Sequence, residues 1–367
     1  GLVCLLHEKP FAGVNGSGKH NNWSMTTNTG YNLLEPGDDP ASSAQFLLFL
    51  CAVIKAVDDY QDLLRISVAT AGNDHRLGAN EAPPAVVSIF LGDELTAILE
   101  SIISGEEYVE VTKRKLEIGV DTLPEIPQDT TDRNRTSPIA FTGNKFEFRM
   151  VGSSQSIASP TAVLNTMMTE ELCKFADILE KAEDFQSALQ KLLKETFTNH
   201  SRIIFNGNGY GEEWIAEAKR RGLSNLRDTV EALPAYIDKR NIDLFGRHGI
   251  LTRAELEARY EIHLENYCKV VTIESNTLLE MTRRYILPAA TTCSGELATA
   301  LFHKQNCGIS EPVTTESAAL RRISELSSKI YNVCGSLENA LKRAPAVDGG
   351  LSAAKYYRDQ VDAKRRK

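Results

Sequence analysis

The chain has 367 residues, 42% hydrophobic and 25% charged, a composition that is ordinary for globular proteins and leaves room for two domains. Its 41 Lys and Arg face 49 Asp and Glu, and the resulting net charge of −8 argues against general nucleic-acid binding. The seven cysteines are scattered and never spaced as C-x-x-C, which predicts neither a zinc knuckle nor a complete disulfide framework and favours a reducing cytoplasm.

The two halves of the chain differ in their patterns. Residues 1–165 have dense Gly and Pro punctuation between short apolar runs, which predicts strands joined by loops, whereas residues 166–345 show helical periodicity. We expect an α+β fold, with 346–367 as a terminal helix and basic tail. The apolar start at residues 1–6 lacks a Met and predicts a buried strand in a truncated sequence. The longest uncharged apolar stretch, residues 44–54, is too short to span a bilayer.

A glycine-rich segment at residues 13–20 fits the G-x-x-x-x-G-K pattern of a phosphate-binding loop, but His20 stands where such a loop needs Ser or Thr. We therefore reject that interpretation. Asn15 and Gly16 belong to a loop whose backbone a ligand can approach closely. In the strand expected next, alternate residues share one face and form a polar surface that we predict to be a binding site, although a lone His is more often structural; they are His20, Asn22 and Ser24.

Two further segments precede the middle of the chain. Residues 44–68 are apolar on nearly every side and predict a helix that is buried behind a site. Residues 69–84 predict a loop that carries Arg76 and Glu81 and has a rigid exit at two prolines. A solvated surface pair of Arg76 with Glu81 is the alternative to a functional role.

A third polar segment contains Arg135 and, further along, a predicted strand with Glu147 and Arg149. Residues two apart on a strand point the same way, so this carboxylate and guanidinium would share one face while Phe146 and Phe148 face the core. A structural ion pair is the plain alternative. We favour a shared ligand.

The second half predicts long helices. One is expected over residues 169–197, a second from a capping box at Thr252 and Glu255 towards 286, ending before Pro288, and a third over 315–343. The cations at 364–367 are better explained by the dipole of a preceding helix than by a localisation signal.

The segment from Asn15 to Ser24 resembles the N-G-[SA]-G-x-H-x-[HN]-x-S signature of glutamine synthetases, and residues 6–11 resemble the version in the type III branch. About 50 residues separate Glu81 from Arg135, and residues 92–105 within that interval predict an inserted helix that also marks this branch. The resemblance implies the C-terminal part of the catalytic domain, a curved antiparallel sheet with helices, followed by a largely helical region.

The resemblance also implies roles for single residues. Arg76 and Arg149 would bind the glutamate substrate together with Asn15 and Gly16, and Glu81 would lie on a flap that closes over the reacting centre. His20 and Glu147 would hold Mg²⁺ or Mn²⁺. The nucleotide and its transferring phosphate would be bound by Asn22, Ser24 and Arg135. A further phosphate-binding arginine of other branches would fall on Ala140 and is missing.

The function that follows is ATP-dependent ligation of ammonia to L-glutamate through γ-glutamyl phosphate, in the cytoplasm. The family's upstream metal-binding glutamates and N-terminal β-grasp domain are not in this sequence, so the chain alone is expected to be inactive. Type III members imply a dodecamer of two hexameric rings. Two alternatives stay open: a γ-glutamyl ligase that uses another amine, and a non-catalytic, truncated assembly or regulatory module.

Overall fold

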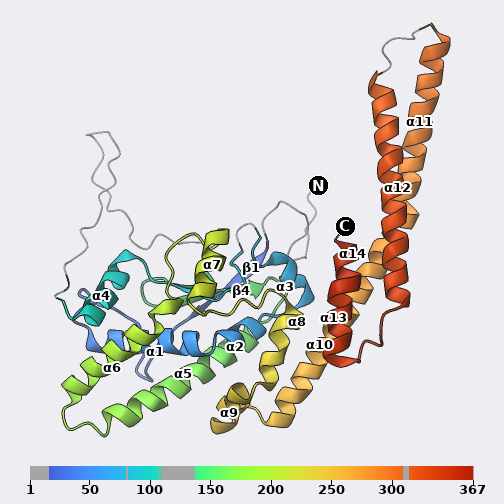
Figure 1. Ribbon diagram of the computed structural model, residues 1–367. Helices are drawn as coiled ribbons and strands as arrows, with labels where there is room; N and C mark the ends of the chain where they lie inside the picture. Colours follow the sequence, from blue (N-terminus) through green and yellow to red (C-terminus); the bar gives the residue numbers. More distant parts are fainter. Residues whose placement is uncertain (1–15, 80–81, 107, 109–136, 309–313, 367) are drawn as a thin grey trace, which may run out of the picture. The chain divides into compact units, whose positions relative to one another are not determined.

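The computed structural model describes residues 16–79, 82–106, 108, 137–308 and 314–366 (Figure 1). The chain divides into two compact units, residues 1–260 and 261–367, with the boundary inside helix α10 (Arg253–Met281). The strand expected at residues 1–6 lies outside the described residues. The division at residue 165 separates stretches of different composition and stays a prediction.

A small sheet of four strands forms in the described part of the first unit. In spatial order the strands are β1 (Gly18–Trp23), β4 (Phe146–Gly152), β3 (Ile139–Phe141) and β2 (Ile89–Phe90). The β1–β4 and β4–β3 pairs are antiparallel, whereas β3 and β2 are parallel. The α+β class is confirmed, and the sheet expected as antiparallel has one parallel pair, between β3 and β2.

One face of this sheet packs on helices. The Phe141 ring lies 5.6 Å from that of Phe46 on α1 (Ala44–Asp59) and 5.2 Å from that of Phe146 on β4. Phe148 and Met150, which alternate with Glu147 and Arg149 along β4, are almost completely buried. All seven residues of β4 are buried, however, so burial does not distinguish the two faces of this strand, and the predicted alternation stays a prediction from strand geometry.

The helix predicted over residues 44–68 forms as α1 and α2 (Gln61–Ile66), which are separated at Tyr60. Many of its side chains are fully buried, as expected for a helix with apolar residues on several faces. The inserted helix predicted over residues 92–105 is α4 (Asp93–Ser104), and the glycines at both ends, Gly92 and Gly105, have positive φ.

The predicted loop over residues 69–84 is partly helical, which corrects that expectation. Residues Ala71–Arg76 form the short helix α3, because the Thr70 side chain caps it by accepting a hydrogen bond from the Asn73 backbone N–H at 3.2 Å. Arg76 is therefore positioned by a helical turn and not by a flexible connection.

The single long helix predicted over residues 169–197 is also wrong. The chain forms α5 (Ala158–Leu179) and α6 (Phe185–His200), which pack against each other. Asp184 starts the second helix by accepting a hydrogen bond from the Gln186 N–H at 3.1 Å, so the chain turns between the two. The unit is completed by shorter helices, α7 (Glu212–Arg220), α8 (Thr229–Ala232) and α9 (Lys239–Arg247), and by 3-10 turns at Ser201–Ile203 and Leu233–Ile237.

A network of buried charges joins three of these helices. Glu171 of α5 is fully buried, and its oxygens lie 3.2 Å from Lys55 Nζ of α1 and 2.8 Å from Lys174 Nζ. The neighbouring Glu170 has two partners at the end of α9. Its Oε1 lies 2.7 Å from Arg247 Nη2, and its Oε2 lies 2.8 Å from His248 Nε2. Each carboxylate therefore has a cation within reach, which offsets the cost of burial.

The second unit contains the rest of α10 and the helices that follow it. The capping box that begins α10 is confirmed, with Thr252 N–H donating to Glu255 Oε2 at 2.8 Å and Glu255 N–H to Thr252 Oγ1 at 3.3 Å. The remaining elements are α11 (Leu287–Asn306), α12 (Thr314–Lys342), α13 (Gly350–Tyr356), a π-helical segment (Tyr357–Asp362) and α14 (Ala363–Arg365).

The helix expected to end before Pro288 continues instead. A π-helical turn at Thr282–Ile286 joins α10 to α11, with Pro288 near the start of α11. Proline lacks the N–H for an α-helical bond and its ring crowds the preceding turn, and the wider π turn gives it room. The third predicted helix is confirmed as α12.

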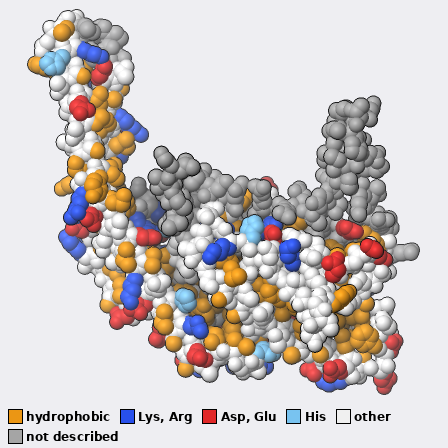
Figure 2. Space-filling view, turned by 180° about the vertical axis from the view of Figure 1, so that it is seen from behind, with side chains coloured by type: hydrophobic (Ala, Val, Ile, Leu, Met, Phe, Trp, Pro, Cys, Tyr) orange, Lys and Arg blue, Asp and Glu red, His pale blue; other side chains and the backbone are white. Residues whose placement is uncertain are grey.

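Helices α11 and α12 run side by side as a hairpin (Figure 1). Hydrophobic side chains gather along its surface (Figure 2). Phe302 of α11 is 60% exposed and Tyr331 of α12 is 71% exposed. Across the described ranges, no helix has both the length and the apolar character needed to cross a bilayer.

Candidate functional site

The outer face of β1 and β4 brings together three of the predicted site residues. In the ladder Asn22 is opposite Glu147, and the register shifts between Lys19 and Asn21, beside His20. His20 Nδ1 lies 3.6 Å from Glu147 Oε2, and the His20 side chain is 60% exposed. Residues 127 positions apart in the sequence thus place an accessible imidazole next to a nearly buried carboxylate.

The opposite face of β1 fixes this orientation. Asn21 Nδ2 donates to Thr161 Oγ1 at 3.2 Å, and Trp23 Nε1 donates to Asn165 Oδ1 at 2.9 Å. Both acceptors belong to α5, so the strand is held to that helix by the residues that alternate with His20. The alternating pattern of this strand indicates such anchoring, since the residues between those of the polar face point to the opposite side and must pack against another element of the fold.

The other two polar residues of this strand face differ from each other. Asn22 is exposed beside Glu147. Ser24 Oγ lies 2.8 Å from Asn32 Oδ1 and 3.0 Å from the carbonyl oxygen of Asn144. Ser24 therefore also holds the loop after β1 in place.

Glu147 and Arg149 form an ion pair on the face predicted for them. Arg149 Nε and Nη2 lie 3.1 and 3.0 Å from Glu147 Oε2, and the two residues are only 3% and 7% exposed. The structural ion pair considered as an alternative is therefore present in this state of the protein. Binding of a ligand by Glu147 or Arg149 stays a prediction.

Arg76 lies under the glycine loop and not at the surface. It is 2% exposed, and it donates from Nη1 to the Met150 carbonyl oxygen at 3.0 Å and from Nη2 to that of Arg149 at 2.9 Å. A Cβ on Gly16 would come within 2.7 Å of Arg76 Cγ, and one on Gly18 within 2.1 Å of Arg76 Nη2. Glycine at both positions therefore lets the loop pack directly on this side chain.

Three predicted site residues, Asn15, Glu81 and Arg135, lie outside the described residues. Ala140, where other branches have an arginine, is buried in β3 opposite Glu147. A methyl group in that place offers no phosphate contact.

The donors at the β1–β4 face fit a divalent cation. One neutral imidazole and one carboxylate are ligands that Mn²⁺ accepts readily and Mg²⁺ accepts in part, and the exposed imidazole can turn towards an ion. Two protein ligands are too few for a tight site, so others must come from substrate oxygens, water or further protein groups.

Another group with metal-ligand spacing occurs among the described residues, at Asp58, Asp59 and His200. Arg202 Nε lies 2.9 and 3.0 Å from the two Asp58 carboxylate oxygens, and Lys55 pairs with Asp59. These cations already compensate the acidic charge, so this cluster is a structural ion-pair network that the sequence did not reveal.

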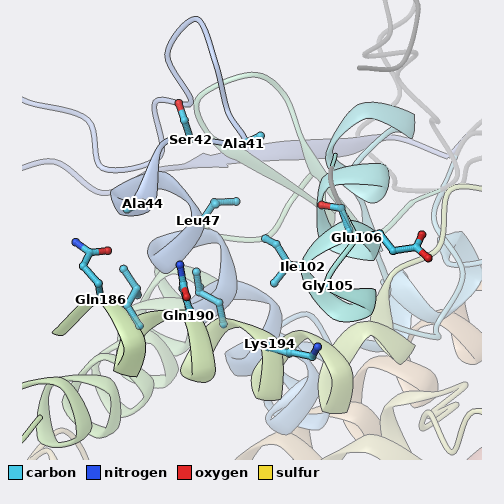
Figure 3. Close-up of a pocket in the computed structure, with 13 residues that line it drawn as sticks. Ala41, Ser42, Ala44, Leu47, Ile102, Gly105, Glu106, Gln186, Gln190 and Lys194 are labelled. Carbon is cyan, nitrogen blue, oxygen red and sulfur yellow. The ribbon is translucent and has the colours of Figure 1, made fainter. Parts of the chain in front are cut away.

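A cavity of about 550 Å³ lies between α1, α4 and α6 (Figure 3). Leu47, Ile102 and Leu189 form much of its lining, and Lys194 and Glu106 contribute charge near the end of α4. None of the predicted site residues lines it, so the candidate site on β1 and β4 is distinct from this cavity.

Comparisons with known proteins agree with the sequence resemblance. A family model described as glutamine synthetase C-terminal domain matches residues 188–305. A type-3 glutamine synthetase of Dictyostelium discoideum is 53% identical over 293 residues, which is 79% of this chain and 40% of that protein.

Two bacterial proteins named glutamine synthetase are also similar. The one from Butyrivibrio fibrisolvens is 43% identical over 98% of this chain and 51% of its own length, and the one from Bacteroides fragilis is 43% identical over 90% and 46%. The chain thus spans about half the length of these relatives or less. With such identity along nearly all of its residues, the chain belongs to the glutamine synthetase family, in its type III branch.

Proposed function

We propose that the protein to which this chain belongs joins ammonia to L-glutamate at the expense of ATP, and that this chain supplies the C-terminal part of the catalytic site. The observation that carries the proposal is the cluster of His20, Glu147 and Arg149 on one face of β1 and β4. Its residues come from the two sequence segments that resemble the family's motifs.

The reaction sets the tasks for these groups. Ammonia does not displace oxide from a carboxylate, so ATP first converts the γ-carboxylate of glutamate into an acyl phosphate. The protein must align donor and acceptor and neutralise the charge on the phosphoryl oxygens. We assign the latter to Arg135, and nucleotide binding to Asn22 and Ser24.

Substrate binding falls to the guanidinium groups. The planar side chain of Arg149 can bind a carboxylate through two hydrogen bonds, and in doing so it would exchange Glu147 for the substrate. Arg76, Asn15 and Gly16 complete this part of the proposed site. A Mg²⁺ or Mn²⁺ ion held by His20 and Glu147 would supply positive charge near the nucleotide phosphates.

Glu81 is proposed to act on the flap. A carboxylate there would help to bind ammonium, take up its surplus proton and keep water from the acyl phosphate. We further propose that the whole protein assembles as a dodecamer of two hexameric rings and works in the cytoplasm. Sedimentation of the whole protein measures its oligomeric state directly, and an assembly smaller than a dodecamer would contradict this proposal.

The activity is tested on the whole protein, expressed from its complete reading frame. Glutamine formation from glutamate, ammonium and ATP with Mg²⁺ or Mn²⁺ should be strongly reduced by the conservative Glu147→Gln and kept by the matched Glu94→Gln, a change on the first turn of α4. Polyamines in place of ammonium test the other γ-glutamyl ligase. A whole protein without synthetase activity towards any amine would contradict the proposal and favour the assembly module.

A further inference from the structure

The second unit has a groove that the proposed reaction does not use. It encloses about 510 Å³ between α12 and the segment formed by α13, the following π turn and α14. The groove is lined mainly by polar and aromatic side chains, including Tyr331, Asn339, Arg343, Tyr356, Gln360 and Lys364.

The lining is positively charged. Arg343 and Lys364 are its two cations, and no Asp or Glu is among its lining residues. Two carboxylates of the same elements are engaged with other cations: Glu338 with Arg283 and Lys342, and Asp362 with Arg365 and Arg366. Among the described residues, no carboxylate lies within ion-pair distance of Arg343 or Lys364, so both charges are available to an anion.

The walls suit a planar group. Tyr356 is held in place because its hydroxyl donates to the Ala340 carbonyl oxygen at 3.0 Å, whereas the ring of Tyr331 is 71% exposed at the groove. An exposed tyrosine ring gains by stacking on a flat apolar surface. Asn332, Asn339 and Gln360 add amide groups that both donate and accept hydrogen bonds.

The backbone of one wall is unusual. Gln360 lies in the π-helical segment Tyr357–Asp362, and Lys364 Nζ donates to its carbonyl oxygen at 3.0 Å and to its Oε1 at 3.1 Å. π-Helical turns are rare and occur frequently at functional sites. Unlike the π turn before Pro288, no proline follows this one to account for it.

From the charge, the aromatic walls and the amides, we propose that this groove binds a small anion with a planar ring, of the nucleoside monophosphate class. Phosphate oxygens would lie between Arg343 and Lys364, and the base would stack on Tyr331. The groove uses none of the residues assigned to the proposed reaction, and the inference does not depend on that proposal.

Calorimetric titration of the whole protein with AMP tests this site. We expect saturable binding that weakens at least about tenfold in Arg343→Ala and in Lys364→Ala, since each removes one of the two cations. Lys342→Ala is the matched control, because Lys342, the last residue of α12, directly precedes Arg343 but pairs with Glu338 at 3.3 Å and does not line the groove. Its affinity for AMP should equal that of the unchanged protein, and unaltered melting temperatures would show that all three variants fold.

Further probes separate this site from a catalytic nucleotide site. Adenosine and inorganic phosphate should each bind more weakly than AMP, and the conservative Glu147→Gln should leave AMP binding at the groove intact. The proposal is overturned if no saturable binding occurs or if Lys342→Ala weakens binding as much as Arg343→Ala. It is also overturned if Glu147→Gln alone abolishes binding, or if inorganic phosphate binds as tightly as AMP.

Discussion

Arg149 directs both Nε and Nη2 to the same oxygen of Glu147, two residues earlier on β4, at 3.1 and 3.0 Å. Both groups are nearly buried, and each compensates part of the other's charge. Removing one of the two would leave the other buried charge less compensated, which typically costs several kcal/mol. Conservative substitutions are therefore the informative ones at these positions.

Arg149→Lys should raise the KM for glutamate and change the KM for ATP little. Lysine keeps the charge but cannot form the planar pair of hydrogen bonds that a carboxylate accepts from arginine. Steady-state kinetics of the whole protein measure both constants. An unchanged KM for glutamate would remove Arg149 from the proposed substrate site.

Glu81→Ala should lower glutamine synthesis far more than nucleotide binding. Without the flap carboxylate, ammonium binding weakens and water competes for the acyl phosphate. Glutamine and phosphate release should be measured together with ATP affinity, and phosphate release should exceed glutamine formation. Equal losses of synthesis and of nucleotide binding would contradict the flap role.

Gly18→Ala should destabilise the protein by about 1–3 kcal/mol, the usual cost of overpacking. The new Cβ would meet Arg76 Nη2 at 2.1 Å, and that group cannot move freely because it is buried and donates to a carbonyl oxygen of β4. Urea unfolding of the purified protein measures the difference.

Gly246→Ala is the control for this substitution. Gly246 lies in α9 with nothing within 4 Å of its prospective Cβ, so the same added methyl group should stabilise the protein, by up to about 1 kcal/mol. If both alanines had the same effect, the close packing of the glycine loop on Arg76 would not be the cause.

Glu170→Gln should destabilise the protein at neutral pH and have less effect in acid. Burial by itself would raise the pKa of Glu170, but hydrogen bonds from His248, Arg247 and Lys174 outweigh it and lower the pKa from 4.5 to about 2. Because the pKa of Glu170 is lower in the folded than in the unfolded protein, the ionised side chain stabilises the fold at pH values above the unfolded pKa. This contribution is lost as the pH falls from about 4.5 towards 2.

The measurement is the urea midpoint of both proteins between pH 7 and the acid limit of folding. At pH 7 we expect a difference of about 1.5–3 kcal/mol, the usual value for hydrogen bonds to a charged group. The difference should shrink on acidification. A difference in stability that stays constant across this pH range would show that the charge of Glu170 does not cause it.

Local patterns were sufficient to predict several parts of the fold. Alternation placed Glu147 and Arg149 on one face of β4, because side-chain direction on a strand follows from sequence spacing alone. The capping box at Thr252 and the glycines around α4 likewise act on their immediate neighbours. These features need no knowledge of distant contacts.

Other parts depended on distant partners or on competing local signals. The break between α5 and α6 falls in a stretch of good helix formers, Glu180–Glu183, where the Asp184 cap decides the outcome. The burial of Arg76 depends on carbonyl oxygens of β4, more than 70 residues later in the chain. No spacing rule within one segment reports either the depth of a side chain or its remote acceptors.

The π turn at Thr282–Ile286 holds one residue more than an α-helical turn would. Because each residue advances a helix by about 100°, the side chains of α11 are rotated by that angle from where an uninterrupted α10 would have placed them. A pattern of apolar residues that continued from α10 into α11 would therefore have to shift by one position in the sequence to stay on the same face. Deleting a single residue from this turn would redirect every side chain from Leu287 to Asn306. We therefore expect related chains to differ here by substitutions and not by insertions or deletions.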